Sequence, residues 1–153
     1  MRPSVEEIEI TKAFRFEAAH RMAKGYIGKC SNIHGHSWRG ELSVICSKLD
    51  EYGMGIDFYQ LDQFLNQIIE YFDHKIILFK EDTELIRLCD LSKWSYVVFD
   101  DENPTSERVA KYIFDEARLY FRESQTDCVV KSVMISETCS SKCVWYEDMN
   151  CVC

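Results

Sequence analysis

The sequence predicts an α+β fold in which two helices cover one face of an antiparallel sheet. Two segments near the N-terminus and two near the C-terminus alternate apolar and polar residues, as half-buried strands do. Two longer segments instead repeat apolar residues at helical spacing. A length of 153 residues with 46% hydrophobic content suits one domain with a core of its own. We therefore expect a single domain over residues 1–153.

Two long strands are predicted in the N-terminal third of the chain, over residues 8–19 and 34–49. Lys12 interrupts the apolar face of the first strand. The residues between the strands, 21–31, include two glycines and predict a loop. Residues 50–55 contain two further glycines and predict a turn. A hairpin pairing of the two strands follows as the simplest arrangement.

Two helices are predicted in the rest of the chain. The first begins after Asp57, whose carboxylate can cap it, and ends near Asp73. The second opens within residues 103–107, where a proline suits the first turn and Thr105 or Asn103 can cap it. The apolar positions of the first helix are Phe58, Leu61, Phe64, Leu65, Ile68, Ile69 and Phe72, and those of the second are Val109, Tyr112, Ile113 and Ala117.

Three shorter strands complete the prediction. A short strand is expected at residues 96–99, and two more at 129–138 and 143–147. Residues 80–93 are polar and irregular, and we expect them to form a surface excursion. The predicted order is strand, strand, helix, short strand, helix, strand, strand.

Charge and hydropathy exclude several classes of partner. The net charge of −8 and the pI of about 5.0 argue against nucleic acid or an anionic membrane as the main partner. The N-terminus is acidic and lacks the apolar stretch of a signal peptide. No apolar run approaches the roughly 20 residues that span a bilayer. We therefore expect a cytoplasmic protein. A local basic cluster is formed by Arg21, Lys24 and Lys29. It either attracts an anionic substrate or is simply part of a solvated loop.

The chain has eight cysteines, and most are expected to be reduced thiols in that compartment. Cys46 falls within a strand pattern and is predicted to be a small buried hydrophobe. Cys89 and Cys128 lie in less regular stretches and have no predicted role. Cys151 and Cys153 stand on the terminal residues, also without a predicted role.

Three of the four histidines are expected to meet at one point. His34 and His36 are two residues apart in a strand, so their rings project from the same face. His20 shares a face with the apolar residues of the preceding strand, and a hairpin would bring it beside the other two. Three neutral imidazoles with one open position are the ligands of a catalytic zinc. Cys30 could instead be a fourth ligand of a structural zinc, although no Cys-x-x-Cys pair accompanies it.

Two further groups could supply acid–base chemistry. If Cys30 is not a ligand, zinc and Lys29 would lower the pKa of its thiol and favour a reactive thiolate; otherwise Cys30 is a passive loop cysteine. Asp73 and His74 follow the first helix, where the helix dipole and the carboxylate both favour a protonated imidazole. They form either an acid–base dyad or a simple capping pair.

Glu137 shares its strand parity with Val133 and Ile135, which places a carboxylate on an apolar face. A buried carboxylate requires a partner. Either an arginine of this chain or a ligand with an aminopyrimidine edge could donate two parallel hydrogen bonds to it.

The motifs, taken in order, resemble the 6-pyruvoyltetrahydropterin synthase family, and within it the bacterial 6-carboxytetrahydropterin synthases of queuosine biosynthesis. The likeness extends from about residue 9 to residue 147. It rests on Phe16-Glu17-Ala18-Ala19-His20-Arg21, Cys30 to His36, Asp57-Phe58, Asp73-His74, Asn103-Pro104-Thr105-Ser106-Glu107 and Glu137-Thr138-Cys139.

The resemblance implies a tunnelling fold, in which the sheets of six subunits, stacked as two trimers, join into barrels with active sites at the interfaces. It implies that 7,8-dihydroneopterin triphosphate is converted to 6-carboxytetrahydropterin with loss of acetaldehyde and triphosphate. The implied roles are zinc ligation by His20, His34 and His36; proton abstraction by Cys30; acid–base chemistry by Asp73 and His74 of a neighbouring subunit; and pterin binding by Glu137 with Thr105 and Ser106.

Two features favour the carboxy branch. Three residues separate Cys30 from the His-Gly-His motif, where the pyruvoyl enzymes typically have a longer gap. The Phe16-Glu17-Ala18-Ala19-His20 run and Glu137-Thr138-Cys139 with Cys143 are similar to the carboxy branch. Phe72, the long segment 80–101 and the cysteine-rich tail depart from the pattern. Two alternatives remain: a 6-pyruvoyltetrahydropterin synthase, and a zinc-stabilised pterin-binding module without turnover.

Overall fold

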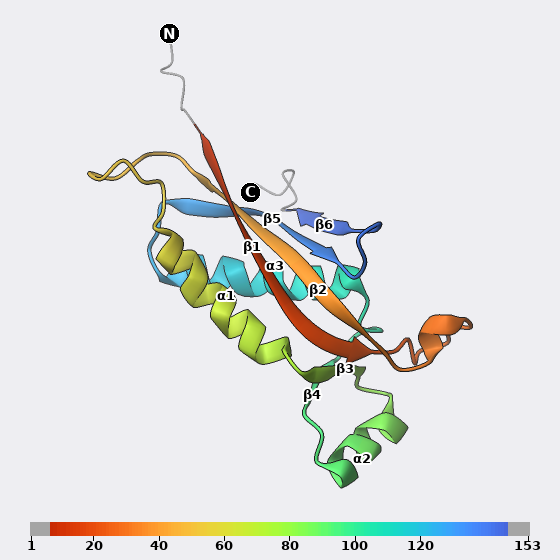
Figure 1. Cartoon of the computed structure of the whole chain (residues 1–153). Helices are drawn as coiled ribbons and strands as arrows, with labels where there is room; N and C mark the ends of the chain where they lie inside the picture. The colour runs from red at the N-terminus through yellow and green to blue at the C-terminus, as the bar shows by residue number, and fades with distance from the viewer. Residues whose placement is uncertain (1–6, 147–153) are drawn as a thin grey trace.

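The structure is a computed structural model that describes residues 7–146. Cys151, Cys153 and the predicted strand end at 147 lie outside this range. Three α-helices, one short 3-10 helix and six strands make up the described chain (Figure 1). In chain order they are β1 (Ile8–His20), η1 (Lys29–Ser31), β2 (His34–Cys46), α1 (Phe58–Phe72), β3 (Lys75–Phe79), α2 (Thr83–Ser92), β4 (Tyr96–Phe99), α3 (Ser106–Glu123), β5 (Cys128–Ser136) and β6 (Cys143–Tyr146).

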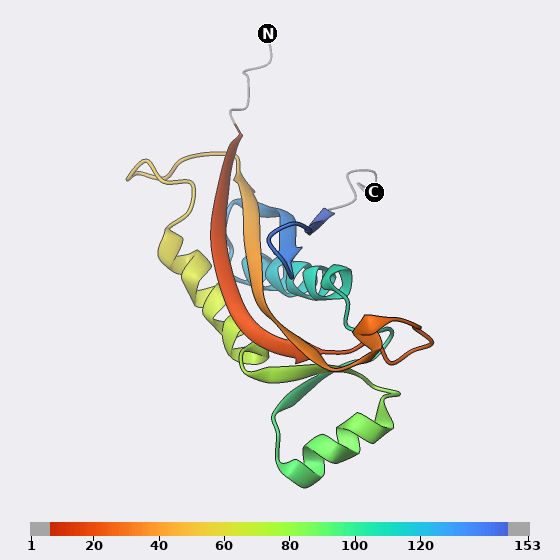
Figure 2. The ribbon, with the colours of Figure 1, turned by 45° about the vertical axis from the view of Figure 1, so that its right-hand side comes forward.

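The six strands form one sheet in the order β4-β3-β1-β2-β5-β6. β1 and β2 pair antiparallel along their whole length, from Ile8 opposite Cys46 to His20 opposite His34, which confirms the predicted hairpin. Both strands bend together, so the sheet is curved (Figures 1 and 2). The sheet is antiparallel, as predicted, except at one edge, where β3 runs parallel to β1 and β4 runs parallel to β3. Parallel neighbours need a crossover, and α2 provides the one between β3 and β4.

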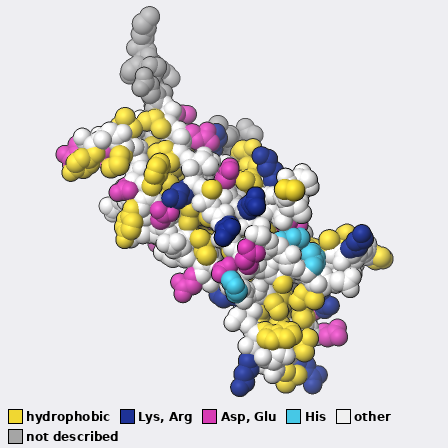
Figure 3. Space-filling model, viewed as in Figure 1, with side chains coloured by type: hydrophobic (Ala, Val, Ile, Leu, Met, Phe, Trp, Pro, Cys, Tyr) yellow, Lys and Arg dark blue, Asp and Glu magenta, His cyan; other side chains and the backbone are white. Residues whose placement is uncertain are grey.

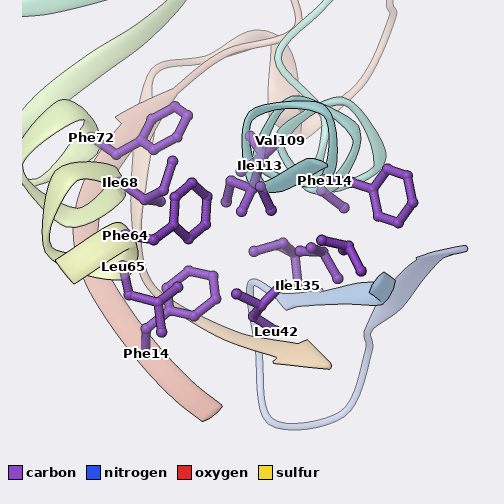
Figure 4. Packing of buried hydrophobic residues seen from close by; sticks show 14 of the residues in the cluster. Phe14, Leu42, Phe64, Leu65, Ile68, Phe72, Val109, Ile113, Phe114 and Ile135 are labelled. Atoms are coloured by element: carbon purple, nitrogen blue, oxygen red, sulfur yellow. The ribbon is translucent and has the colours of Figure 1, made fainter. Parts of the chain in front are cut away.

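The two long helices cover one face of this sheet, as predicted. α1 packs against β1, and α3 packs against β5 and β6. The side chains between the layers alternate along the strands: Phe14, Phe16 and Ala18 of β1 point to the helices and the residues between them do not. Figure 4 shows Phe64, Phe72, Ile113 and Ile135 in this core. Asp57 and Thr105 cap the two helices, since their side chains accept hydrogen bonds from the backbone N–H groups of Tyr59 and Arg108.

The expectation of an irregular excursion at residues 80–93 is wrong. The segment contains α2, whose buried residues Leu85 and Cys89 pack with Leu78 of β3 in a small separate cluster. Only two buried positions in ten residues leave a weak helical pattern, which is why the sequence did not reveal it. α2 lies apart from α1 and α3 (Figure 1), and exposed hydrophobic side chains gather over it in Figure 3. Within the described residues, no helix is both long and apolar enough to cross a membrane.

A disulfide joins Cys46 at the end of β2 to Cys128 at the start of β5, residues that face each other in the strand register. Both side chains are buried. Cys46 is buried in the core, as predicted, but it is paired in a disulfide and is not a reduced thiol. The two cysteines are 82 residues apart, so only the pairing of β2 with β5 brings them together. Cys30, Cys89, Cys139 and Cys143 are free thiols among the described cysteines.

We expect this disulfide to stabilise the fold. Closing a long loop restricts the unfolded chain, and such a bridge typically contributes about 2–4 kcal/mol. Dithiothreitol should therefore lower the Tm of the wild-type protein but not that of a Cys46→Ala/Cys128→Ala double variant, as measured by differential scanning fluorimetry. A wild-type Tm that is indifferent to reductant would contradict this expectation.

Candidate metal centre and active site

Three histidines meet where β1 and β2 approach the loop between them. His20 ends β1, and His34 and His36 open β2, with His34 directly opposite His20 in the register. The ring centroids lie 4.6 Å (His20–His34), 5.2 Å (His20–His36) and 4.9 Å (His34–His36) apart. One nitrogen of each ring lies within 4.8 Å of the others. The predicted convergence of the three rings is confirmed.

Backbone carbonyls orient two of these rings. The Nδ1 of His20 lies 2.7 Å from the carbonyl oxygen of Pro104, and the Nδ1 of His34 lies 2.8 Å from that of Asn32. A carbonyl only accepts hydrogen bonds, so each Nδ1 carries a proton, and in the neutral imidazole this leaves the lone pair on Nε2. This second bond of a ligating histidine is the usual way in which its tautomer is set.

Two of the Nε2 atoms lack a hydrogen bond. The Nε2 atoms of His20 and His36 are buried, and no group among residues 7–146 forms a hydrogen bond with either of them. Buried polar atoms are almost always satisfied, so these two call for a ligand. A metal ion between the rings would satisfy both, and the donor set of three imidazoles suits zinc. The residues present therefore fit the metal that the sequence predicts.

Burial favours the neutral, metal-binding form of His20 and His36. The side chain of His20 is 1% exposed, and its burial lowers its pKa to about 4 even though the hydrogen bond to Pro104 opposes the shift. Burial, followed by the charge of His34, also lowers the pKa of His36. Neutral imidazole is the form that coordinates zinc.

The lowered pKa of His20 predicts a pH dependence for the metal-free protein. Above pH 6.5 the ring is neutral in both the folded and unfolded chains. Between pH 6.5 and about 4 only the unfolded chain takes up the proton, so stability falls as the pH falls. The loss is at most about 3 kcal/mol. Urea unfolding of the wild type and His20→Gln across this range measures it; equal pH slopes for the two proteins would contradict the prediction.

Glu137 lies beside the histidines. β5 ends at Ser136, so Glu137 follows the strand directly. The predicted strand, which extended to residue 138, therefore ends too late. Its two carboxylate oxygens lie 3.9 Å from the Nε2 of His20 and 3.8 Å from the Nε2 of His36. Its side chain is 28% exposed, and burial, followed by the charge of Glu107, raises its pKa. Among the described residues, the basic side chains within 4.0 Å of its carboxylate are these two histidines and not an arginine.

Cys30 lies in η1, within the loop that connects the histidines. Its side chain is half-buried, and its carbonyl accepts a hydrogen bond of 2.8 Å from the N–H of Met22. Within the described chain, the set of ligand atoms that converge on one point contains the three histidines and not the Cys30 thiol. The geometry therefore favours an open metal position over a site closed by Cys30.

Asp73 and His74 form a hydrogen-bonded pair. The Nδ1 of His74 lies 2.6 Å from Oδ2 of Asp73, while Oδ1 accepts the backbone N–H of Glu17 at 2.8 Å. The hydrogen bond from Glu17, followed by that from His74, lowers the pKa of Asp73. His74 adopts a left-handed backbone conformation with φ of 56°, and its N–H bonds the carbonyl of Glu17. The pair is thus fixed to β1, and the His74 side chain is 80% exposed.

Thr105 and Ser106 begin α3, next to the carbonyl that holds His20. The hydroxyl of Thr105 accepts the N–H of Arg108 as the helix cap, so Thr105 has a structural role of its own. The Ser106 hydroxyl lies 3.4 Å from a carboxylate oxygen of Glu107. Both residues stand at the N-terminus of a long helix, where the partial positive charge favours electron-rich groups.

Two residues of the basic cluster near the histidines, Arg21 and Lys24, contact other side chains of the chain. The guanidinium of Arg21 donates two hydrogen bonds to the buried Asp82, at 2.7 and 2.5 Å, and the ammonium of Lys24 lies 5.4 Å above the Phe79 ring. Histidine side chains reach the surface between the main body and the protruding loop (Figure 3). The sequence revealed neither the partner of Arg21 nor the carbonyl contact of His20, because both depend on residues more than 60 positions away.

The chain is similar to known proteins in both sequence and fold. Residues 9–148 match the family model described as 6-pyruvoyl tetrahydropterin synthase. The chain is 32% identical to the 6-carboxy-5,6,7,8-tetrahydropterin synthase of Aquifex aeolicus, over 92% of this chain and 98% of that protein. The fold is similar to that of an uncharacterized protein from Wolinella succinogenes, with a TM-score of 0.80, 23% identity, and coverage of 94% and 99%. The 6-pyruvoyl tetrahydropterin synthase of Caenorhabditis elegans matches with a TM-score of 0.67, 21% identity, and coverage of 93% and 96%.

Proposed function

This chain belongs to the 6-pyruvoyl tetrahydropterin synthase family, and from that premise we propose that it is a zinc-dependent 6-carboxy-5,6,7,8-tetrahydropterin synthase. The proposed reaction converts 7,8-dihydroneopterin triphosphate and water to 6-carboxytetrahydropterin, acetaldehyde and triphosphate, within queuosine biosynthesis. The observation that carries the proposal is the histidine triad, with two buried Nε2 atoms that have no hydrogen-bond partner in the described part of the chain.

Two points support the carboxy product over the pyruvoyl product. The Aquifex aeolicus relative, which aligns over nearly the whole of both chains, is named for the carboxy product. The spacing of three residues between Cys30 and His34 also agrees with that branch.

We assign the following roles in the reaction to residues of this chain. His20, His34 and His36 would hold the zinc, which when bound polarises oxygen atoms of the substrate. Cys30 takes a proton from a side-chain carbon of the substrate onto its sulfur. Glu137 accepts hydrogen bonds from the amino group and the adjacent ring nitrogen of the pterin, with help from Thr105 and Ser106.

Asp73 and His74 would provide the second acid–base group, and we propose that they serve the site of a neighbouring subunit. Asp73 holds the Nδ1 of His74, so the Nε2 is presented outward on a ring that is largely exposed in one chain. The proposed assembly, a homo-hexamer of two trimers with active sites at the interfaces, rests on the resemblance to the family, and the exposed ring of His74 leaves that side chain free to enter a neighbouring site. The mass in solution, measured by light scattering, tests the assembly.

Product analysis tests the reaction. The zinc-loaded protein is incubated with 7,8-dihydroneopterin triphosphate, and the products are identified by mass spectrometry with a separate assay for acetaldehyde. Acetaldehyde together with a 6-carboxypterin product supports the proposal. A pyruvoyl product without acetaldehyde would identify a 6-pyruvoyltetrahydropterin synthase. Binding of a pterin without any turnover would instead identify a pterin-binding module.

A further inference from the structure

The loop between β1 and β2 determines where Cys30 stands relative to the histidines. It begins directly after His20 and ends directly before His34, so both of its ends are fixed by two of the triad residues. Most of its side chains between 23 and 29 are exposed, and Figures 1 and 2 show it protruding from the sheet. A protruding, solvated loop has few packing contacts to hold it, so its hydrogen bonds decide its position.

The loop is closed on itself near Cys30. The N–H of Met22 donates to the carbonyl of Cys30 at 2.8 Å. This bond links the outgoing arm of the loop, which follows His20, to the returning arm, which leads to His34. The Ser31 hydroxyl and backbone N–H both donate to the carbonyl of Gly28, at 2.7 and 3.1 Å. Cys30 therefore moves with the arm that contains Met22 and Lys24.

Asn103 holds that arm from outside the loop. Its Oδ1 accepts the backbone N–H of Lys24 at 2.8 Å, and its Nδ2 donates to the carbonyl of Lys24 at 3.1 Å. One amide side chain thus satisfies both backbone groups of a residue 79 positions away, as a neighbouring strand would. An amide is suited to this because it carries a donor and an acceptor side by side.

The neighbours of Asn103 fix the metal centre itself. The carbonyl of Pro104 accepts the hydrogen bond of His20, and Thr105 caps α3. The N–H of Thr105 also donates to the carbonyl of Asn103 at 2.8 Å, which makes the segment compact. The triad and the Cys30 loop are thus both attached to the segment 103–105, so their separation depends on it.

We propose that Asn103 is a positioning residue, which sets the distance and direction of Cys30 from the metal centre through the backbone of Lys24. The proposal rests on the proposed function in so far as Cys30 is the proton-abstracting group. Proton transfer requires close approach of the thiolate to the substrate carbon. Loss of the Asn103 contacts would leave the triad and Cys30 intact but release the loop that aligns them.

The test compares Asn103→Ala, which removes both hydrogen bonds, with Asn103→Asp, which keeps the acceptor for the Lys24 N–H and loses the donor. Asn66→Ala is the matched control, because Asn66 is exposed on α1. Three properties are measured on the full chain: deuterium exchange of the peptide over residues 21–33, alkylation of Cys30 by iodoacetamide in the metal-free protein, and zinc content with kcat and KM of the loaded protein.

In Asn103→Ala we expect the amides of the loop to exchange faster, by about tenfold, and the alkylation rate of Cys30 to change. We expect kcat to fall roughly tenfold to a hundredfold, since a misplacement of about 1 Å can have that effect. KM should stay within about twofold and zinc content should match the wild type, because the pterin and metal contacts lie outside the loop. Asn103→Asp should be intermediate, and Asn66→Ala should behave as the wild type.

Wild-type exchange and alkylation in Asn103→Ala would overturn the proposal. A fall in kcat without faster loop exchange would overturn it too, because Asn103 would then act on the substrate or on stability. If Asn103→Ala does not fold, Asn103→Asp decides by the same measurements. If the wild type fails to turn over the pterin, the proposed function fails, while exchange and alkylation still decide whether Asn103 positions Cys30.

Discussion

Replacement of Cys30 by alanine is expected to lower turnover of 7,8-dihydroneopterin triphosphate by a hundredfold or more, on the order expected for loss of a general base. Zinc content should stay that of the wild type, because the three converging ligand atoms come from the histidines and not from Cys30. The fold should also be retained, since Cys30 is only half-buried and lies in a surface loop. Acetaldehyde release by the zinc-loaded variant measures the effect.

Cys89→Ala is the matched control for this variant, since it removes a free thiol from the α2 cluster, away from the triad. It should lose stability but not turnover. Loss of zinc from Cys30→Ala at neutral pH would show instead that Cys30 is the fourth ligand of a structural zinc. Turnover equal to the wild type would show that it is a passive loop cysteine.

Replacement of Glu137 by glutamine is expected to weaken pterin binding by about 2–3 kcal/mol, the value of one charge-assisted bidentate contact. This corresponds to roughly thirtyfold to more than a hundredfold in affinity. The substitution keeps the size of the side chain but turns one acceptor into a donor that faces another donor on the ligand. Calorimetric titration of the zinc-loaded protein with a pterin analogue measures the difference.

The free protein should tolerate Glu137→Gln, because burial already disfavours the charged carboxylate. Glu41→Gln, on the exposed face of β2, serves as control. Unchanged pterin affinity would show that the carboxylate serves the protein and not the ligand. Loss of zinc would show that Glu137, whose oxygens lie 3.8 and 3.9 Å from two histidine nitrogens, completes the metal site.

Local periodicity accounts for most of the fold. The long strands β1 and β2 and the helices α1 and α3 were all predictable, because each has one face buried against the core over many residues. β3 was missed because its side chains do not alternate between buried and exposed, and α2 was missed because only two of its ten residues are buried. The parallel pairing of β3 with β1 was missed for a different reason: strand direction depends on the path of the chain and not on the alternation of its side chains.

Part of the candidate site was likewise predictable from the sequence, and part was not. The convergence of His20, His34 and His36 was predictable, because a hairpin register and the alternation of strand side chains determine which residues share a face. The adjacency of Asp73 and His74 was visible, but spacing alone left open whether the two side chains meet, since adjacent residues often point apart.

The sequence by itself determined the fold class, the two capped helices and the three histidines on one face, because these follow from spacing along one or two neighbouring segments. The tertiary structure alone decided which distant groups meet: the disulfide of Cys46 with Cys128, the carbonyl of Pro104 on His20, and the amide of Asn103 on Lys24. Each joins residues about 80 positions apart, and a contact of that kind leaves no periodic trace in the chain. It is set by how the sheet and helices pack around the core that the pattern predicts.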